Sequence, residues 1–118
     1  MHELSIAMSI LDVAGEEAVR QNVRVLVVRL RLGPLSGVVK EALLSSYEMA
    51  RVDSLVPDSC LEIEEVAILM NCPACGQRQP VESIQQLRCA TCGTPAYDIA
   101  QGRELEVVGL EVVDLEET

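Results

Sequence analysis

The sequence contains no phenylalanine and no tryptophan, only two tyrosines, and a single histidine, His2. Hydrophobic residues still make up 49% of the 118 residues, so any core must be built from aliphatic side chains. Nineteen acidic residues against nine basic ones give a net charge of −10. A nucleic-acid-binding domain needs a basic surface and usually aromatic side chains that stack on bases. The composition therefore excludes nucleic acid as the expected partner and favours cations or basic proteins.

Long apolar runs are also missing. No segment approaches the roughly 20 apolar residues that cross a bilayer, and the N-terminus lacks the basic and apolar regions of a secretory signal. There is no glycine-rich phosphate loop, and no second histidine is available to activate a serine or cysteine nucleophile. We therefore expect a cytoplasmic protein that is not an enzyme and does not bind membranes.

The spacing of apolar residues predicts an α+β fold with a three-stranded sheet and two helices. We expect helices over residues 4–21 and from Ser36-Gly37 to about Arg51, and strands over residues 24–32, 60–68 and 103–115. The expected buried positions are Leu4, Ala7, Met8, Leu11, Ala14, Gly15 and Ala18 in the first helix, and Val39, Leu43, Leu44 and Tyr47 in the second.

Three local features carry narrower expectations. The doubled Val27-Val28 shifts the alternation of the first strand, which indicates a bulge or a strand covered on both sides. Cys60 lies on an alternating strand and is expected to be buried structural filler, since free cysteine is among the most buried residue types. The acidic pairs at residues 16–17, 64–65 and 116–117 are expected to be solvated faces.

Residues 70–102 differ in composition from the rest of the chain. They hold four of the five cysteines, three of the five prolines and three of the seven glycines. Such a segment between two strands indicates a small module inserted into a discontinuous domain. We expect one domain from residues 1–69 plus 103–118, and a second from residues 70–102.

Two C-x-x-C-G motifs lie in this module, at Cys72, Cys75 and Gly76 and again at Cys89 and Cys92 before Gly93. Glycine tolerates the positive φ that a tight ligand turn needs. The pair predicts a structural zinc site with four thiolates and no open position. Iron in a rubredoxin-like electron carrier is the rival, because a tetrahedral S₄ site serves both metals. A zinc-ribbon adaptor or nucleic-acid module is the other alternative, although it should be basic.

The opening residues Met1, His2 and Glu3 bring several nitrogen donors together. The Met1 amine, the Met1–His2 amide and the His2 imidazole can close five- and six-membered chelate rings around one ion. A fourth donor is either the His2–Glu3 amide or the Glu3 carboxylate. A square-planar set of this kind suits Ni²⁺ or Cu²⁺.

The combination of a Met1-His2-Glu3-Leu4-Ser5 start with paired C-x-x-C motifs before a final acidic strand resembles the HypA/HybF family of nickel metallochaperones. The stretch from Leu32 to Val38, Leu-Gly-Pro-Leu-Ser-Gly-Val, is similar to that family's loop after the first strand. The resemblance covers essentially the whole chain.

The resemblance implies a nickel-binding α/β domain with a small zinc domain, and delivery of Ni²⁺ to the large subunit of [NiFe]-hydrogenase during its maturation. It implies a HypB-type GTPase as partner and leaves a homodimer open. Nickel would fall on His2, with Glu3 and the Met1 amine nearby, and zinc on Cys72, Cys75, Cys89 and Cys92. Histidines that flank the zinc motifs in some members of the family are absent from this sequence.

Overall fold

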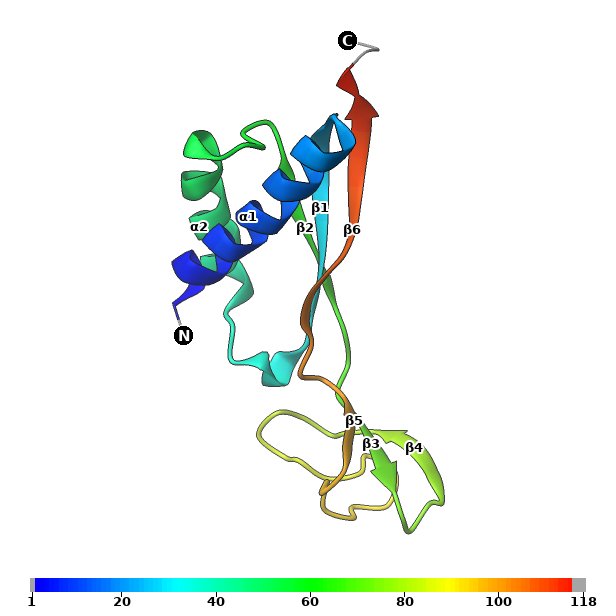
Figure 1. Ribbon diagram of the computed structural model, residues 1–118. Coiled ribbons are helices and arrows are strands. Elements are labelled where there is room, and N and C mark those ends of the chain that lie inside the picture. Colours follow the sequence, from blue (N-terminus) through cyan, green and yellow to red (C-terminus); the bar gives the residue numbers. More distant parts are fainter. Residues whose placement is uncertain (1, 116–118) are drawn as a thin grey trace. The chain divides into compact units, whose positions relative to one another are not determined.

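The structure is a computed structural model that describes residues 2–115. Its elements are α1 (Glu3–Gln21), β1 (Val23–Leu32), α2 (Lys40–Ala50), β2 (Cys60–Glu65), β3 (Leu69–Cys72), β4 (Gln77–Pro80), β5 (Ile99–Gln101) and β6 (Leu105–Asp114), with 3-10 turns at Pro34–Ser36 and Arg51–Asp53 (Figure 1). The strands form two three-stranded sheets, in the orders β2-β1-β6 and β4-β3-β5. The predicted α+β class with two helices and a three-stranded sheet is confirmed. The sequence did not predict the second sheet, which lies in the cysteine-rich segment.

The described chain divides into two compact units. The first holds residues 2–30, 38–64 and 106–115, and the second holds residues 31–37 and 65–105. The predicted domain limits differ from these units at both boundaries, and the loop at 31–37 belongs to the second unit. The division into two domains, residues 1–69 plus 103–118 and residues 70–102, remains a prediction from the sequence. Neither α1 nor α2, the α-helices of residues 2–115, combines the length and the hydropathy of a membrane-spanning helix.

Helix α1 packs against α2 on one side of the sheet formed by β2, β1 and β6 (Figure 1). The helix ends at Asn22, whose left-handed φ of 53° lets its N–H donate to the carbonyl groups of Ala18 and Val19. Its buried face consists of Ile6, Ala7, Ile10, Leu11, Ala14, Gly15 and Ala18. Two residues of the predicted stripe, Leu4 and Met8, are instead 42% and 54% exposed. The buried face is therefore centred closer to Ile6 and Ile10 than the sequence spacing predicted.

Strand β1 is the centre of the first sheet. Its buried residues move from the odd position Val25 to the even positions Val28, Leu30 and Leu32, so the predicted change of alternation at the double valine is present. Arg29 projects between the buried positions and forms salt bridges with carboxylates on both neighbouring strands, at 3.6 Å to β2 and 3.1 Å to β6. Salt bridges thus link the three strands on the face of the sheet that the helices do not cover. Because these side chains are about half exposed, each pair contributes little stability.

Helix α2 contributes Leu43 and Tyr47 to the core, and both are fully buried. The Tyr47 hydroxyl lies 2.6 Å from the Ser59 Oγ, which donates in turn to the carbonyl of Val56 at 2.7 Å. Burial is the main cause that raises the pKa of Tyr47. The prediction that Val39 would be buried is wrong: it precedes the first helical residue and is 56% exposed.

The second unit has a small core of its own. Its buried residues are Ile68, Met70, Cys72, Val81 and Cys89, against which Leu35, Cys75, Ala96 and Ile99 pack. Strand β3 pairs antiparallel with both β4 and β5. The predicted strand over residues 60–68 ends at Glu65 instead, and pairing resumes in the second sheet at Leu69.

Candidate metal centres

Four cysteine thiols meet in the second unit. The Sγ atoms of Cys72, Cys75, Cys89 and Cys92 all lie within 4.8 Å of one another. Cys72 Sγ is 3.5 Å from Cys92 Sγ, and Cys75 Sγ is 3.9 Å from Cys89 Sγ. A tetrahedron of thiolates at the usual Zn–S distance of about 2.3 Å has edges of about 3.8 Å. The cluster therefore has the donor type and the dimensions of a four-thiolate metal site.

Each C-x-x-C-G motif forms a tight turn that is closed in the same way. The N–H of Gly76 donates to the carbonyl of Cys72, and the N–H of Gly93 donates to the carbonyl of Cys89, both at 2.9 Å. The two glycines have φ angles of 71° and 78°, in the left-handed region that side chains disfavour. In the first turn, the N–H of Cys75 also points at the Cys72 Sγ from 3.4 Å. The glycine after each cysteine pair is thus required by the backbone conformation.

The four thiols are unequally accessible. Cys72 and Cys89 are buried in the core of the unit, Cys75 is half-buried, and Cys92 is exposed. The first ligand of each motif is therefore fixed by packing around it, and the second lies nearer to solvent. Any reagent or competing ligand reaches the cluster most directly at Cys92.

Thr94 contacts this exposed thiol. Its Oγ1 lies 3.1 Å from the Cys92 Sγ, and its carbonyl accepts the N–H of Cys89 at 2.8 Å. The hydroxyl is the main cause that lowers the pKa of Cys92 to about 6. A hydrogen bond with Cys92 is the main cause that raises the pKa of Cys75 to about 12. The contact with Thr94 thus favours the thiolate form of Cys92, whereas Cys75 is favoured as the thiol.

Sequence reasoning missed Thr94. Its only signal is a hydroxyl residue two positions after the last cysteine, which is too common to single out. The role of the loop at residues 33–37 was also missed. Leu35 packs on the core behind the cysteines, so this loop, which the sequence placed in the nickel domain, supports the cysteine cluster.

The predicted nickel ligands lie at the start of α1, except that Met1 lies outside the described residues. His2 is exposed and extended, with φ −85° and ψ 133°, and immediately precedes the helix. Glu3 is the first helical residue. Its Oε2 accepts the backbone N–H of Val39 at 3.2 Å, which is the largest cause that lowers the pKa of Glu3. The Glu3 carboxylate therefore caps the start of α2, where Val39 provides no side-chain cap.

The fifth cysteine does not match its prediction. Cys60 is exposed at the start of β2, whereas its neighbours Ser59 and Leu61 are buried. Alternation along the strand therefore places Cys60 on the uncovered face of the sheet. Its expected role as buried filler is wrong.

Comparison with known proteins gives one consistent family. A sequence model described as "Hydrogenase/urease nickel incorporation, metallochaperone, hypA" matches residues 1–112. Among curated proteins, the hydrogenase maturation factor HypA of Roseiflexus sp. (strain RS-1) is 42% identical over 115 residues, covering 97% of this chain and 94% of that protein. HypA of Chloroflexus aurantiacus (strain ATCC 29366 / DSM 635 / J-10-fl) is 40% identical over 112 residues, covering 94% and 98%.

The fold agrees with solved structures of the same family. The solution structure of the Ni metallochaperone HypA from Helicobacter pylori superposes with a TM-score of 0.67 at 26% identity, covering 97% of this chain and 99% of that one. A second HypA solution structure gives a TM-score of 0.71 at 26% identity, covering 96% and 97%. The chain therefore belongs to the HypA family of hydrogenase/urease nickel incorporation metallochaperones.

Proposed function

We propose that this protein binds Ni²⁺ at its N-terminus, through Met1, His2 and Glu3, and delivers it to the large subunit of a [NiFe]-hydrogenase during maturation. The observation that carries the proposal is the whole-chain family match in a protein whose only histidine is exposed at position 2. The proposal requires a free amine on Met1.

The start of α1 suits a chelating site. The first N–H groups of a helix have no acceptor within the helix, so the His2 and Glu3 amides can lose their protons to a metal without breaking the helical ladder. The helix N-terminus carries partial positive charge that favours this deprotonation. The Glu3 carboxylate already accepts a hydrogen bond from Val39. This contact favours the Glu3 amide, and not its carboxylate, as the fourth donor.

Such a site can also release its ion. His2 is exposed, and its imidazole and the Met1 amine must be unprotonated to bind, so nickel should dissociate as the pH falls below neutrality. A cage of buried ligands would hold the ion more tightly but would release it slowly. An open terminal chelate is suited to transfer, since a receiving protein can replace the donors one at a time.

The four cysteines are proposed to hold one structural zinc. Zinc with four thiolates has no open position and stabilises a fold that is too small to be stable alone. The small size of the core behind the cysteines is consistent with this role, because two of its five buried residues are the ligands Cys72 and Cys89 themselves. Colourless purified protein would support zinc, whereas the absorption of an iron–thiolate centre would contradict it.

Two protein partners follow from this proposal. One is the large subunit of the hydrogenase, which receives the nickel, and the other is a HypB-type GTPase. The resemblance leaves a homodimer open. The acidic composition, with a net charge of −10, favours partners with basic surfaces.

Calorimetry and metal analysis on untagged protein test the metal sites together. We expect one zinc per chain and one exchangeable Ni²⁺, with the spectrum of square-planar nitrogen ligation. Either His2→Ala or one extra residue before Met1 should abolish the nickel titration and leave zinc content unchanged. The matched control is Ser9→Ala, an exposed position on the same helix that lies two turns away.

Transfer itself is tested by loading the protein with nickel and mixing it with nickel-free hydrogenase large subunit. The proposal predicts that nickel appears on the large subunit from wild type but not from His2→Ala. Equal nickel affinity in wild type and His2→Ala, or sulfur ligation of the bound nickel, would contradict the terminal site.

A further inference from the structure

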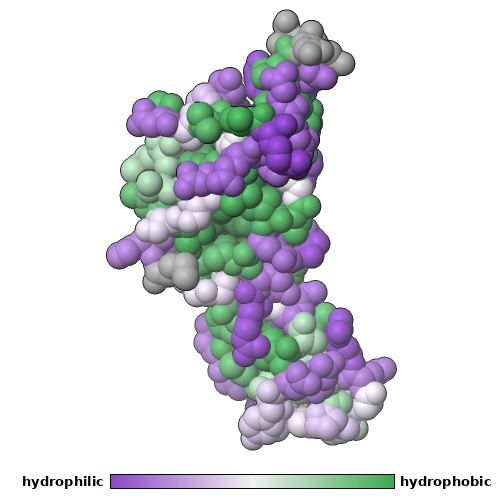
Figure 2. Space-filling view, in the orientation of Figure 1, coloured by the Kyte–Doolittle hydropathy of each residue, from purple (hydrophilic) through white to green (hydrophobic). Residues whose placement is uncertain are grey.

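A groove between α1 and α2 is accounted for neither by the metal sites nor by the core of the first unit. It has a volume of about 320 Å³ and is lined by Leu4, Met8, Leu11, Asp12, Met49, Ala50, Asp53 and Ser54. Figure 2 shows apolar residues gathered over this side of the two helices, between areas of polar surface. Three of the lining side chains are large, apolar and exposed: Leu4 at 42%, Met8 at 54% and Met49 at 68%.

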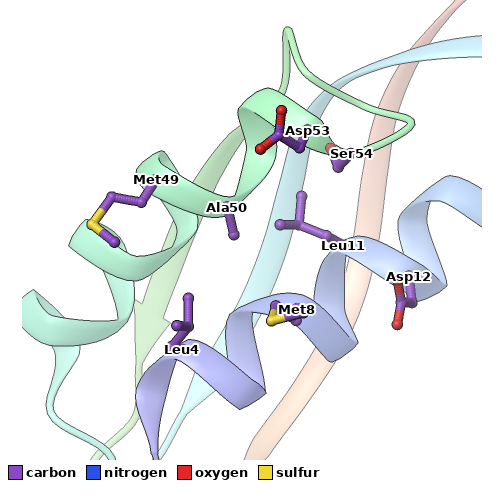
Figure 3. A pocket seen from close by; sticks show the side chains of 8 residues that line it. All are labelled: Leu4, Met8, Leu11, Asp12, Met49, Ala50, Asp53 and Ser54. Atoms are coloured by element: carbon purple, nitrogen blue, oxygen red, sulfur yellow. The ribbon is translucent and has the colours of Figure 1, made fainter.

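The groove is divided into an apolar and an acidic end. Leu4 and Met49 lie toward one end, and Asp12, Asp53 and Ser54 lie toward the other (Figure 3). Ser54 is satisfied within its own turn, because its Oγ donates to the carbonyl of Arg51 and accepts the N–H of Val56. In the described part of the chain, neither aspartate forms a salt bridge or side-chain hydrogen bond, and no basic residue lines the groove.

These features describe a surface that needs an occupant of opposite charge. Exposed apolar side chains gathered in one place mark interaction sites, and methionine is frequent on binding surfaces because its flexible side chain adapts to different shapes. Two unpaired carboxylates beside them favour a cation. A second copy of this chain would bring another −10 of net charge, so a self-association at this surface would be opposed electrostatically.

We infer that the α1–α2 groove is the docking site for a cationic amphipathic segment of a partner protein, which places apolar side chains on Met8 and Met49 and a lysine or arginine beside Asp12 and Asp53. Recognition of this kind, by an amphipathic helix in an apolar groove, is a recurring mode of protein binding. Because Leu4 directly follows Glu3, a docked partner would lie close to the proposed nickel ligands. This consequence rests on the proposed function, whereas the docking site itself does not.

The experiment uses the full-length, zinc-loaded protein and two designed helical peptides. One peptide carries leucine on one face and lysine on the other, and the second replaces each lysine by glutamate. Chemical-shift mapping and calorimetry at low salt measure binding to wild type. The inference predicts that the lysine peptide binds with shifts concentrated around Met8, Asp12, Met49 and Asp53, and that the glutamate peptide does not bind.

Two double variants separate the two parts of the groove. Met8→Ser with Met49→Ser removes the apolar contacts. It should weaken binding about tenfold or more, which corresponds to a loss of about 1.4 kcal/mol of binding free energy. Asp12→Asn with Asp53→Asn keeps the shape and should weaken binding about threefold to tenfold and reduce its salt dependence. Val19→Ser is the matched control, because Val19 is 69% exposed on α1 outside the groove and its loss should leave binding unchanged.

The outcomes are distinct. Shifts spread over the acidic surface, or binding that is unaffected by both double variants, would overturn the inference. Sedimentation of wild type without peptide tests the other occupant: a dimer that Met8→Ser with Met49→Ser dissolves would assign the groove to a second copy and also overturn it. Nickel titration of the same samples keeps the two proposals apart. Failure of wild type to bind nickel would refute the proposed function but leave the peptide result standing.

Discussion

Replacing Gly33 by alanine should destabilise the second unit although the backbone conformation accepts alanine. Gly33 has φ −98° and ψ 147°, which is ordinary extended backbone. A Cβ at this position would lie 2.2 Å from the carbonyl oxygen of Gly102, 2.3 Å from its carbonyl carbon and 2.7 Å from the Glu104 Oε1. Two of these three atoms belong to the backbone, so a side-chain rotation cannot relieve the clash.

The size of this destabilisation follows from the hydrogen bonds that join the two backbone segments near Gly33. The N–H of Gly33 donates to the carbonyl of Glu104 at 2.8 Å, and the N–H of Leu35 donates to the carbonyl of Gly102 at 2.7 Å. Ordinary contact distances are about 3.5 Å, so the two segments must separate by roughly 1 Å. Losing both hydrogen bonds costs about 2 kcal/mol in all, and overpacking adds about 1–3 kcal/mol. We expect Gly33→Ala to lower the free energy of unfolding by about 3–5 kcal/mol.

Urea unfolding followed by circular dichroism, at matched zinc content, measures this difference. Because Leu35 packs on the core behind the cysteines, we also expect Gly33→Ala to release zinc faster to a chromogenic chelator. Gly109→Ala is the matched control: nothing lies within 4 Å of the added Cβ, and its effect should stay within about 0.5 kcal/mol. If Gly33→Ala is as mild as this control, the close approach is not needed for stability and the reasoning is refuted.

Three further predictions concern single hydrogen bonds. Thr94→Val should speed the transfer of zinc to a chelator several-fold, since the exposed Cys92 thiolate loses its hydroxyl donor, and Thr94→Ser should restore the wild-type rate; an unchanged rate in Thr94→Val would contradict this role. Tyr47→Phe should lower the free energy of unfolding by about 1–2 kcal/mol, because the buried Ser59 hydroxyl loses the Tyr47 hydroxyl and keeps only the carbonyl of Val56 as a partner; thermal unfolding can check this, and an unchanged Tm would contradict it. The pKa of Glu3 is lowered from its usual 4.5, so its contribution to stability is present above that pH and is lost as the pH falls through the lowered value. Glu3→Gln should therefore be less stable than wild type at neutral pH and equally stable in strong acid. Urea unfolding at both pH values measures this, and a difference in the free energy of unfolding that does not depend on pH would contradict the role of the Glu3 carboxylate.

The bounds of a helix or strand could be predicted where the local sequence pattern agrees with the burial seen in the structure. Helix α1 was expected over residues 4–21 and occupies Glu3–Gln21. Strand β1 was expected over residues 24–32 and occupies Val23–Leu32. Both have long periodic runs and end at residues that stop them, Asn22 with its left-handed backbone and the Gly33-Pro34 pair. Such signals lie within a few residues and do not depend on what packs against them.

Exposure was predicted less well, because it depends on which neighbour is present. Leu4 and Met8 continue the apolar stripe of α1, yet α2 does not cover them and they line an open groove. Cys60 follows the alternation of β2, but within residues 2–115 no helix covers the face of the sheet on which it lies. Sequence periodicity shows that a helix or strand has an apolar side; it does not show how far the covering element extends.

The four-thiolate cluster and the family could both be predicted from the residues alone. Ligand spacing within each C-x-x-C-G motif is set by a turn of five residues, and the glycine conformation that closes it is a local property. Only the tertiary structure showed that Thr94 contacts Cys92, that the Glu3 carboxylate caps α2, and that the loop at residues 33–37 supports the cysteine unit. The Thr94 contact is local, but its signal, a hydroxyl residue two positions after a cysteine, is too common to predict it. The contacts of Glu3 and of the loop join segments that are far apart in the sequence, and they form only because the chain folds back on itself.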